Sequence, residues 1–271
     1  MNEIKNYDVY NKRMSKTLYD KCWWIDKIDD KVDVIVDYGC GDGSLFHMIN
    51  SICPNKFTYI GIDNDANMLK AAVINVPNGK FYSSIDELGR DFWSPANLYS
   101  DNTVLVLNSV MHELFTYLSD KEQSKLFTVI HKKLRPKYIA IRDMYISCGQ
   151  YPECNLNDIT SNIENSKFSD RAVSYAKSNS AIHHLTLLNT VDYVTEFFLK
   201  YTYVENWERE KDEVYLWDWM DILNQHFVGI YNVKFENNFY IPFIRERIKN
   251  DFDIDWNINT HRKVLYQLDK S

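Results

Sequence analysis

The order of apolar and polar positions along the chain predicts strands and helices that alternate. Short apolar runs rich in β-branched residues are typical of buried parallel strands, and apolar residues spaced three and four apart are typical of amphipathic helices. The expected strands are Val32–Tyr38, Phe57–Ile62, Lys80–Ser84, Thr103–Val110 and Tyr138–Met144. This alternation predicts an α/β protein with a parallel sheet between layers of helices.

Three segments between these strands have the features of helices. Ser44–Ile52 follows a glycine-rich turn and stops before Pro54, which cannot continue a helix. A second helix is expected at Asp65–Ile74, and a third opens at the capping box Ser119–Glu122. Between the third and fourth strands, 86–100 predicts a loop or a weak helix broken by proline.

After Tyr145 the pattern changes. Residues 146–185 are polar and rich in Ser, Asn and Asp, which indicates an insertion, and a strongly aromatic segment follows it. The elements expected here are a helical piece near Arg171–Lys177, helices at Asp192–Trp207, Trp217–Phe227 and Pro242–Phe252, and strands at Tyr231–Phe239 and Arg262–Leu268.

The turn after the first strand contains glycines at three alternate positions, Gly39, Gly41 and Gly43. Glycine allows positive φ and the close approach of a ligand. Asp37 and Asp42 lie in or beside the turn, and the sequence has no Lys or Arg between positions 32 and 51. A dinucleotide site uses G-x-G-x-x-G spacing and backbone amides for a pyrophosphate, which acids would repel. This turn therefore favours a cationic ligand that carries an ammonium and a sulfonium, and a turn without a ligand is the alternative.

From Asp37 to Gly43 the chain reads acid-x-Gly-x-Gly-x-Gly, and here it resembles the class I S-adenosylmethionine (SAM) dependent methyltransferases. The resemblance covers about residues 30–145 and, weakly, the last strands. It implies a doubly wound, seven-stranded, mostly parallel sheet with one antiparallel strand. The expected parts are an N-terminal helical cap (1–30), a SAM-binding Rossmann-like core (31–145), an aromatic-rich helical insertion or substrate lid (146–213) and the completion of the sheet (214–271).

The N-terminal cap has apolar residues at helical spacing. They are Tyr7, Tyr10, Met14, Leu18, Cys22 and Ile25. The resemblance implies that such a helix covers the cofactor, whereas the pattern alone equally allows a helix that completes the core.

The cofactor ligands are expected at the ends of the first strands. Asp63 ends the second strand 20 residues after Gly43, the separation at which α/β nucleotide sites present a carboxylate to the ribose. A helix N-cap is its alternative role, although Asn64 or Asp65 could cap as well. The resemblance implies an adenine contact after the third strand, from Ser84 or Asp86. The full predicted set is Asp37, Gly39, Cys40, Gly41, Gly43, Asp63, Asn64, Ser84, Asp86 and Asn108.

The segment after the fourth strand, Asn108–Leu114, is expected to face the reactive end of the cofactor because ligands bind at the carboxyl ends of parallel strands. It contains His112 and Glu113. A histidine titrates near neutral pH, so His112 is a candidate general base, or it packs against the cofactor without moving a proton. The resemblance implies that Asp143, near the end of the fifth strand, lines the acceptor pocket. We predict catalytic roles for these three residues.

Other motifs are missing from the sequence. The Asn/Asp-Pro-Pro-aromatic pattern of exocyclic-amine DNA methyltransferases and a Pro-Cys nucleophile for cytosine carbon-5 are both absent. Adjacent His183 and His184 have no carboxylate spaced with them, and the five cysteines form no C-x-x-C pair, so no metal is expected. Reduced thiols and a polar N-terminus favour a soluble cytoplasmic protein without a membrane segment.

Charge limits the partners. The chain has 31 basic and 38 acidic residues, and a net charge of −7 argues against broad binding to nucleic acid or anionic membranes. The basic run His131–Lys137 closes a helix, where it opposes the dipole, and a nucleic-acid patch is its alternative interpretation.

Three functional hypotheses follow. The first is a SAM-dependent methyltransferase that acts on a small molecule or a single nucleoside held under an aromatic lid. The second is a methyltransferase of RNA or single-stranded DNA that stacks a base on those aromatic residues. The third is a non-catalytic binding subunit that keeps the fold. The acidic balance favours the first, and the intact turn and Asp63 count against the third. The sequence does not decide the oligomeric state.

Overall fold

A computed structural model describes residues 4, 6–92, 101–145, 155–183, 190–215 and 219–269 of the chain. The chain packs into two compact units. The sheet unit comprises Asp8–Asp143, Trp219–Asn237 and Lys263–Ser271, and the helical unit comprises Met1–Tyr7, Met144–Asp218 and Asn238–Arg262. The expected division of the chain after residues 30, 145 and 213 stays a prediction, because the two units are defined only by how the chain packs.

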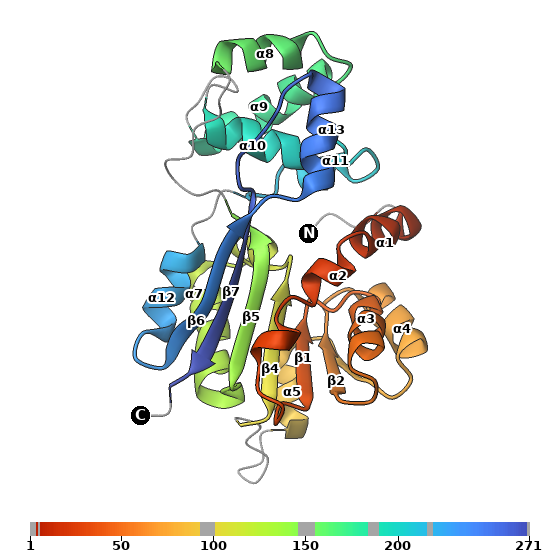
Figure 1. The fold of residues 1–271 in the computed structure, drawn as a ribbon, viewed down its shortest axis with the longest axis vertical. Coiled ribbons are helices and arrows are strands. Elements are labelled where there is room, and N and C mark those ends of the chain that lie inside the picture. The colour runs from red at the N-terminus through yellow and green to blue at the C-terminus, as the bar shows by residue number, and fades with distance from the viewer. Residues whose placement is uncertain are drawn as a thin grey trace. The chain divides into compact units, whose positions relative to one another are not determined.

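One seven-stranded sheet organises the fold, in the order β3-β2-β1-β4-β5-β7-β6 (Figure 1). Its strands are β1 Val34–Tyr38, β2 Thr58–Ile62, β3 Lys80–Tyr82, β4 Thr103–Asn108, β5 Tyr138–Met144, β6 Tyr231–Phe239 and β7 His261–Leu268. The first five strands pair in parallel, so that Asp37 of β1 lies beside Gly61 of β2 and Val106 of β4. All six residues of β4 are buried, as a strand at the centre of a two-sided sheet requires.

The last strand runs in the opposite direction to its neighbours. The Leu268 amide at the end of β7 donates to the carbonyl of Lys137, which precedes β5, over 2.9 Å. At the other end, the Tyr145 amide donates to the carbonyl of Thr260 over 3.0 Å. This reversed pairing confirms the predicted fold class, a mostly parallel seven-stranded α/β sheet with one antiparallel strand.

Helices occupy the connections between the strands. In the sheet unit they are α1 Tyr7–Ser15, α2 Leu18–Lys21, α3 Ser44–Ile52, α4 Ala66–Asn75, α5 Ile85–Phe92, α6 Met111–Tyr117, α7 Asp120–Val129 and α12 Trp219–Phe227, with a 3₁₀ turn at Ile25–Lys27 and a π-helical turn at Ile130–Leu134. The capping box of α7 is confirmed, because the Ser119 amide donates to Glu122 Oε2 over 2.9 Å. The connection expected as a loop or weak helix contains α5.

The N-terminal segment differs from the single helix that its spacing predicts. It forms two helices, α1 and α2, with a break at Lys16 and Thr17. The Thr17 hydroxyl donates to the Met14 carbonyl over 3.3 Å, the kind of local side-chain bond that competes with helix propagation. The break turns the short α2 into a separate element.

The helical unit contains the insertion. Its helices are α8 Leu156–Glu164, α9 Ser169–His183, α10 Val191–Lys200, α11 Trp207–Glu210 and α13 Pro242–Phe252. The expected helix from 192 to 207 is interrupted after Lys200, where β-branched Thr202 and Val204 disfavour helix. His183 ends α9, and His184, Cys148 and Cys154 lie outside the described residues.

The helical unit has its own aromatic core. Phe197 and Phe198 of α10 and Tyr201, which directly follows this helix, are fully buried. Phe198 packs edge-on against Trp256 with ring centroids 5.1 Å apart. The ring of Tyr201 lies 4.9 Å from that of Phe252. The aromatic residues that the sequence assigns to a lid therefore fill the interior of this unit.

Across the parts of the chain that the structure describes, none of the helices combines the length and apolar character needed to cross a membrane.

Candidate cofactor and active site

The glycine turn between β1 and α3 has the backbone that its sequence predicts. Gly39, Gly41 and Gly43 have φ values of +78°, +54° and +75°. A Cβ at Gly39 would lie 3.0 Å from Val110, and one at Gly43 would lie 3.0 Å from Val76, so these positions are packed. A Cβ at Gly41 would meet no described heavy atom within 4 Å. Gly41 therefore borders open space, where a ligand could approach the backbone.

The end of β2 holds this turn in place. The Gly39 and Cys40 amides donate to the Ile62 carbonyl over 2.8 and 3.0 Å, and the Gly41 amide donates to Asp63 Oδ2 over 2.8 Å. Asp63 Oδ1 accepts from the Asp65 amide over 2.9 Å. These two bonds fix the orientation of the Asp63 carboxylate and use part of its acceptor capacity.

Asp65, and not Asp63, caps α4. Its Oδ1 accepts from the amides of Asn67 and Met68 over 2.8 and 3.2 Å. The alternative role for Asp63, a helix N-cap, is therefore taken by its neighbour. Asp63 lies at the glycine turn instead.

Asp37, the acid of the first motif, is 2% exposed. The Tyr59 hydroxyl donates to its Oδ2 over 2.5 Å. Burial raises the pKa of Asp37 to about 6, and the Tyr59 hydrogen bond and the positive charge of Lys21 oppose this rise. The carboxylate is costly to bury without a cation, which makes this a favourable place for a positively charged group.

The remaining predicted cofactor contacts differ in their surroundings. The Cys40 side chain is buried, and burial raises the pKa of its thiol, so that only the backbone of Cys40 could serve a ligand. Ser84 Oγ accepts from the Glu87 amide over 3.2 Å at the start of α5. Asp86 is exposed and pairs with Lys125 over 2.6 Å. Asn64 is exposed. Cofactor contacts of these four residues stay predictions.

The turn after β4 brings the predicted catalytic residues to the end of β5. Ser109 has φ +57°, a strained value for a residue with a side chain, and its amide donates to the Arg142 carbonyl over 2.7 Å. Arg142 Nη1 donates to the Ser109 hydroxyl over 3.2 Å. These bonds hold the turn that leads into α6, on which His112 lies.

His112 and Asp143 form a buried pair, with exposures of 7% and 0%. His112 Nδ1 lies 2.9 Å from Asp143 Oδ1, and the His112 amide donates to Asp143 Oδ2 over 3.2 Å. A carboxylate at Nδ1 favours the tautomer with the proton there, which makes Nε2 the basic nitrogen. Asp143 is thus the predicted catalytic residue that contacts the His112 ring, whereas Glu113 is half-buried on α6.

Sequence reasoning did not find Lys21, which the structure brings to the same edge of the sheet. Lys21 ends α2 and is 9% exposed. Its ammonium interacts electrostatically with Asp37, Asp42 and Asp143 from three separate elements. Its sequence position, one polar residue in an amphipathic helix, carries no signal of such long-range packing.

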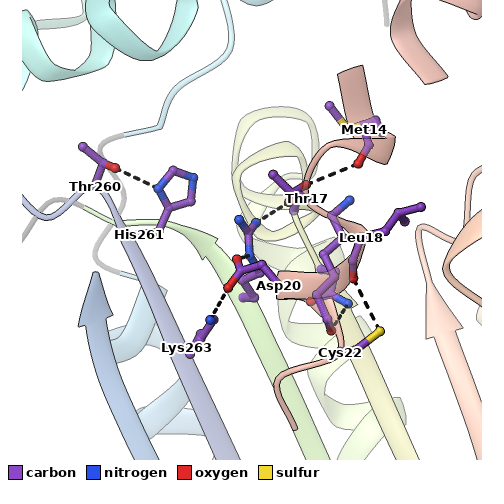
Figure 2. Close-up of polar contacts among 12 residues, drawn as sticks. Met14, Thr17, Leu18, Asp20, Cys22, Thr260, His261 and Lys263 are labelled. Atoms are coloured by element: carbon purple, nitrogen blue, oxygen red, sulfur yellow. Dashed lines mark hydrogen bonds and ion pairs between the residues drawn. The ribbon is translucent and has the colours of Figure 1, made fainter. Parts of the chain in front are cut away.

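The neighbouring Asp20 anchors α2. Asp20 Oδ2 accepts from Arg142 Nε of β5 over 2.6 Å, and Oδ1 accepts from Lys263 of β7, as Figure 2 shows for Lys263. The two cations lower the pKa of Asp20, although its partial burial acts in the opposite direction. The end of α2 is thus fixed to two strands.

No protein-family model and no curated protein matches the chain. Among solved structures it is similar to a SAM-dependent methyltransferase from Archaeoglobus fulgidus, with 10% identity and a TM-score of 0.49 over 96% of this chain and 99% of that one. It is also similar to the plantazolicin methyltransferase BpumL in complex with a monoazolic desmethylPZN analog and SAH, with 13% identity and a TM-score of 0.49 over 97% and 89%. The methyltransferase domain of bacterial CtHen1 has 11% identity and a TM-score of 0.48 over 95% and 98%. Likeness at this level identifies no activity or acceptor for this chain.

Proposed function

We propose that this chain is a SAM-dependent methyltransferase that acts on a small-molecule or single-nucleoside acceptor. The observation that carries the proposal is the grouping of an open glycine, Gly41, two fixed acids, Asp37 and Asp63, and the His112–Asp143 pair in one unit. This grouping lies at the carboxyl ends of β1, β2, β4 and β5, where α/β sheets bind ligands.

The residues fit the cofactor in charge and space. Gly41 would let the adenosine half approach the backbone, and Asp63, held beside it, would accept from the ribose hydroxyls. The acids favour a cationic cofactor and oppose a pyrophosphate. When bound, SAM supplies an activated methyl on its sulfonium, so the chain needs mainly to bind, orient and exclude water.

The His112–Asp143 pair would serve an acceptor that loses a proton. Asp143 orients the imidazole through Nδ1, so that Nε2 can take the proton from a hydroxyl or ammonium as the methyl arrives. The two bonds from one carboxylate to the ring and the amide of His112 fix the ring against rotation. Asp143 acts here as a positioning residue.

Two observations favour a small acceptor over a nucleic acid. The net charge of −7 and the acids at the site repel a phosphate backbone. The aromatic residues of α10, which could have stacked a base, are buried in the core of the helical unit. The nucleic-acid and non-catalytic alternatives become outcomes of the following test.

The test supplies methyl-labelled SAM to the protein with a small-molecule extract, or with RNA or single-stranded DNA. Label in a small-molecule product is expected. Label that stays with polynucleotide after washing would favour the nucleic-acid alternative. Tight binding of S-adenosylhomocysteine (SAH) without any labelled product would favour the binding subunit.

The catalytic assignment is tested by His112→Gln. Loss of a general base lowers kcat by about 10²–10⁴-fold, whereas the affinity for SAH should change little. His47→Gln, at an exposed position of α3, is the matched control and should keep the wild-type kcat. Wild-type kcat in His112→Gln would show that His112 packs without moving a proton.

A further inference from the structure

A cavity of about 280 Å³ lies between the helices α8 and α9 of the helical unit, and we call it the α8–α9 cavity. Both helices belong to the same unit and pack against each other. Sites for small molecules occupy about 300–1,000 Å³, so this volume lies close to the lower end of that range. The cavity is therefore large enough for a small compound.

The cavity exists because one face of α9 carries small side chains. Ala172 and Ala176 both line it and lie one helical turn apart. Alanine leaves space that longer side chains fill where two helices pack closely. Buried Ile163 of α8 and half-exposed Val173 of α9 complete the apolar part of the lining. The walls thus suit an apolar body.

The turn between the two helices is fixed. The Ser166 hydroxyl donates to the Ile163 carbonyl at the end of α8 over 2.7 Å and accepts from the Phe168 amide over 3.1 Å. The Phe168 ring packs edge-on against that of Tyr201 in the aromatic core, with centroids 4.7 Å apart. The cavity is therefore formed before a ligand arrives, which lowers the cost of binding.

Two polar side chains line the cavity beside this turn, Glu164 at the end of α8 and Ser169 at the start of α9. The Glu164 carboxylate is exposed, and it makes no hydrogen bond or ion pair with any residue that the structure describes. The Ser169 hydroxyl likewise makes no hydrogen bond within the described ranges. Among the described residues that line the cavity, none is Lys, Arg or His. The charge of the lining is thus negative and uncompensated.

We propose that the α8–α9 cavity binds a small organic cation, whose apolar body packs on the alanine face of α9 and whose ammonium donates to the Glu164 carboxylate and the Ser169 hydroxyl. Charge selects this ligand class, because an anion would meet a carboxylate and no cation. A neutral compound of the same shape would gain the apolar contacts alone. The proposal does not depend on the proposed function, since all its residues belong to the helical unit.

The experiment titrates the full chain with three probes that share an indole body and differ in the charge of the side chain. Tryptamine is a cation, tryptophol is neutral and indole-3-acetate is an anion at pH 7. Ligand-observed NMR measures their affinities. Tryptamine should bind saturably with a Kd of about 1 mM or lower, and it should bind more tightly than tryptophol, with indole-3-acetate the weakest.

Two variants separate the charge from the space. Glu164→Gln should weaken tryptamine by about three- to tenfold, as expected for an ion pair that water partly screens, and leave tryptophol within about twofold. Ala176→Leu should weaken all three probes by about tenfold or more, because the leucine side chain occupies the cavity and still favours helix. Asp158→Asn, an exposed acid of α8 that does not line the cavity, is the matched control and should change nothing.

The contrary results are equally defined. No saturable binding of tryptamine to the wild type, or equal affinities for the cation and the anion, would overturn the proposal. Tryptamine binding that survives unchanged in Ala176→Leu, with a wild-type circular dichroism spectrum, would place the ligand elsewhere and also overturn it. Self-association of the wild type that Ala176→Leu abolishes would assign the cavity to a second copy of the chain instead.

Binding of SAH is measured on the same samples. Wild-type protein that binds tryptamine but not SAH would keep the α8–α9 cavity while the proposed function fails. Protein that binds SAH but not tryptamine would have the opposite meaning.

Discussion

Two sets of buried polar groups, one in each unit, differ in how their hydrogen bonds are made. In the helical unit, Glu196 and Lys200 are both fully buried and pair over 2.6 Å. Glu196 also accepts from the Tyr175 hydroxyl and the Tyr215 amide, each over 2.9 Å. In the sheet unit, Asn108 Oδ1 is buried and accepts no hydrogen bond from the described residues.

We infer from this difference that the first set is structural and that the second belongs to the proposed binding site. A buried ion pair with all its hydrogen bonds made needs nothing further and fixes the packing around it. Unsatisfied buried groups destabilise the protein that contains them, and such a cost is acceptable where a ligand completes the hydrogen bonds. We therefore expect substitutions of the buried ion pair in the helical unit to lower stability strongly. Substitutions at the proposed site in the sheet unit should change stability little and weaken cofactor binding strongly.

The largest effect on stability is expected from Lys200→Met. It leaves the Glu196 carboxylate buried without its cation, and the free energy of unfolding should fall by about 3–5 kcal/mol in denaturant titrations. The double variant Glu196→Gln with Lys200→Met should recover part of this loss, because no buried charge remains. Lys249→Met, at an exposed position of α13, is the control. A loss below about 1 kcal/mol would mean that the buried Glu196–Lys200 pair contributes no more to stability than an exposed salt bridge does.

A smaller effect of opposite sign is expected from Asp37→Asn. Burial raises the folded-state pKa of Asp37 from its ordinary 3.8 to about 6, so the folded state binds this proton more tightly than the unfolded state does. The contribution of Asp37 to the free energy of unfolding is therefore most favourable below pH 4. It declines as the pH rises to 6 and stays unfavourable at higher pH.

Asp37→Asn removes this cost, so above pH 6 the variant should be more stable than the wild type by up to about 3 kcal/mol. Loss of the counter-charge to Lys21 reduces the gain. The difference should disappear at pH 4, which urea titrations at the two pH values measure. A variant less stable than wild type at pH 7.5 would show that the Asp37 carboxylate stabilises the fold.

Much of the sheet unit could be predicted from the sequence, because its signals are local. Apolar runs predict the strands, and glycines at alternate positions predict the turn. The separation between this turn and Asp63 is typical of a βαβ unit. The proximity of His112 and Asp143 could be predicted because His112 follows β4 and Asp143 lies near the end of β5, at the same edge of the sheet.

Other features depend on contacts between distant segments. Lys21 lies near the acids at this edge of the sheet because Asp20 pairs with Arg142 and Lys263, which are far away in the sequence, and no local pattern contains that information. The aromatic residues of α10 look alike in sequence whether they line a pocket or fill a core. Their burial in the helical unit was therefore not predictable from composition.

The most direct measurement is a calorimetric titration of wild-type protein with SAH, with NAD as the comparison. We expect saturable binding of SAH and little binding of NAD, which carries a pyrophosphate. In Asp63→Ala the affinity for SAH should fall by about 10- to 100-fold while the fold is retained. Binding of NAD in preference to SAH, or no saturable heat with SAH, would contradict the claim that the acid-lined edge at β1 and β2 holds a cationic adenosyl cofactor.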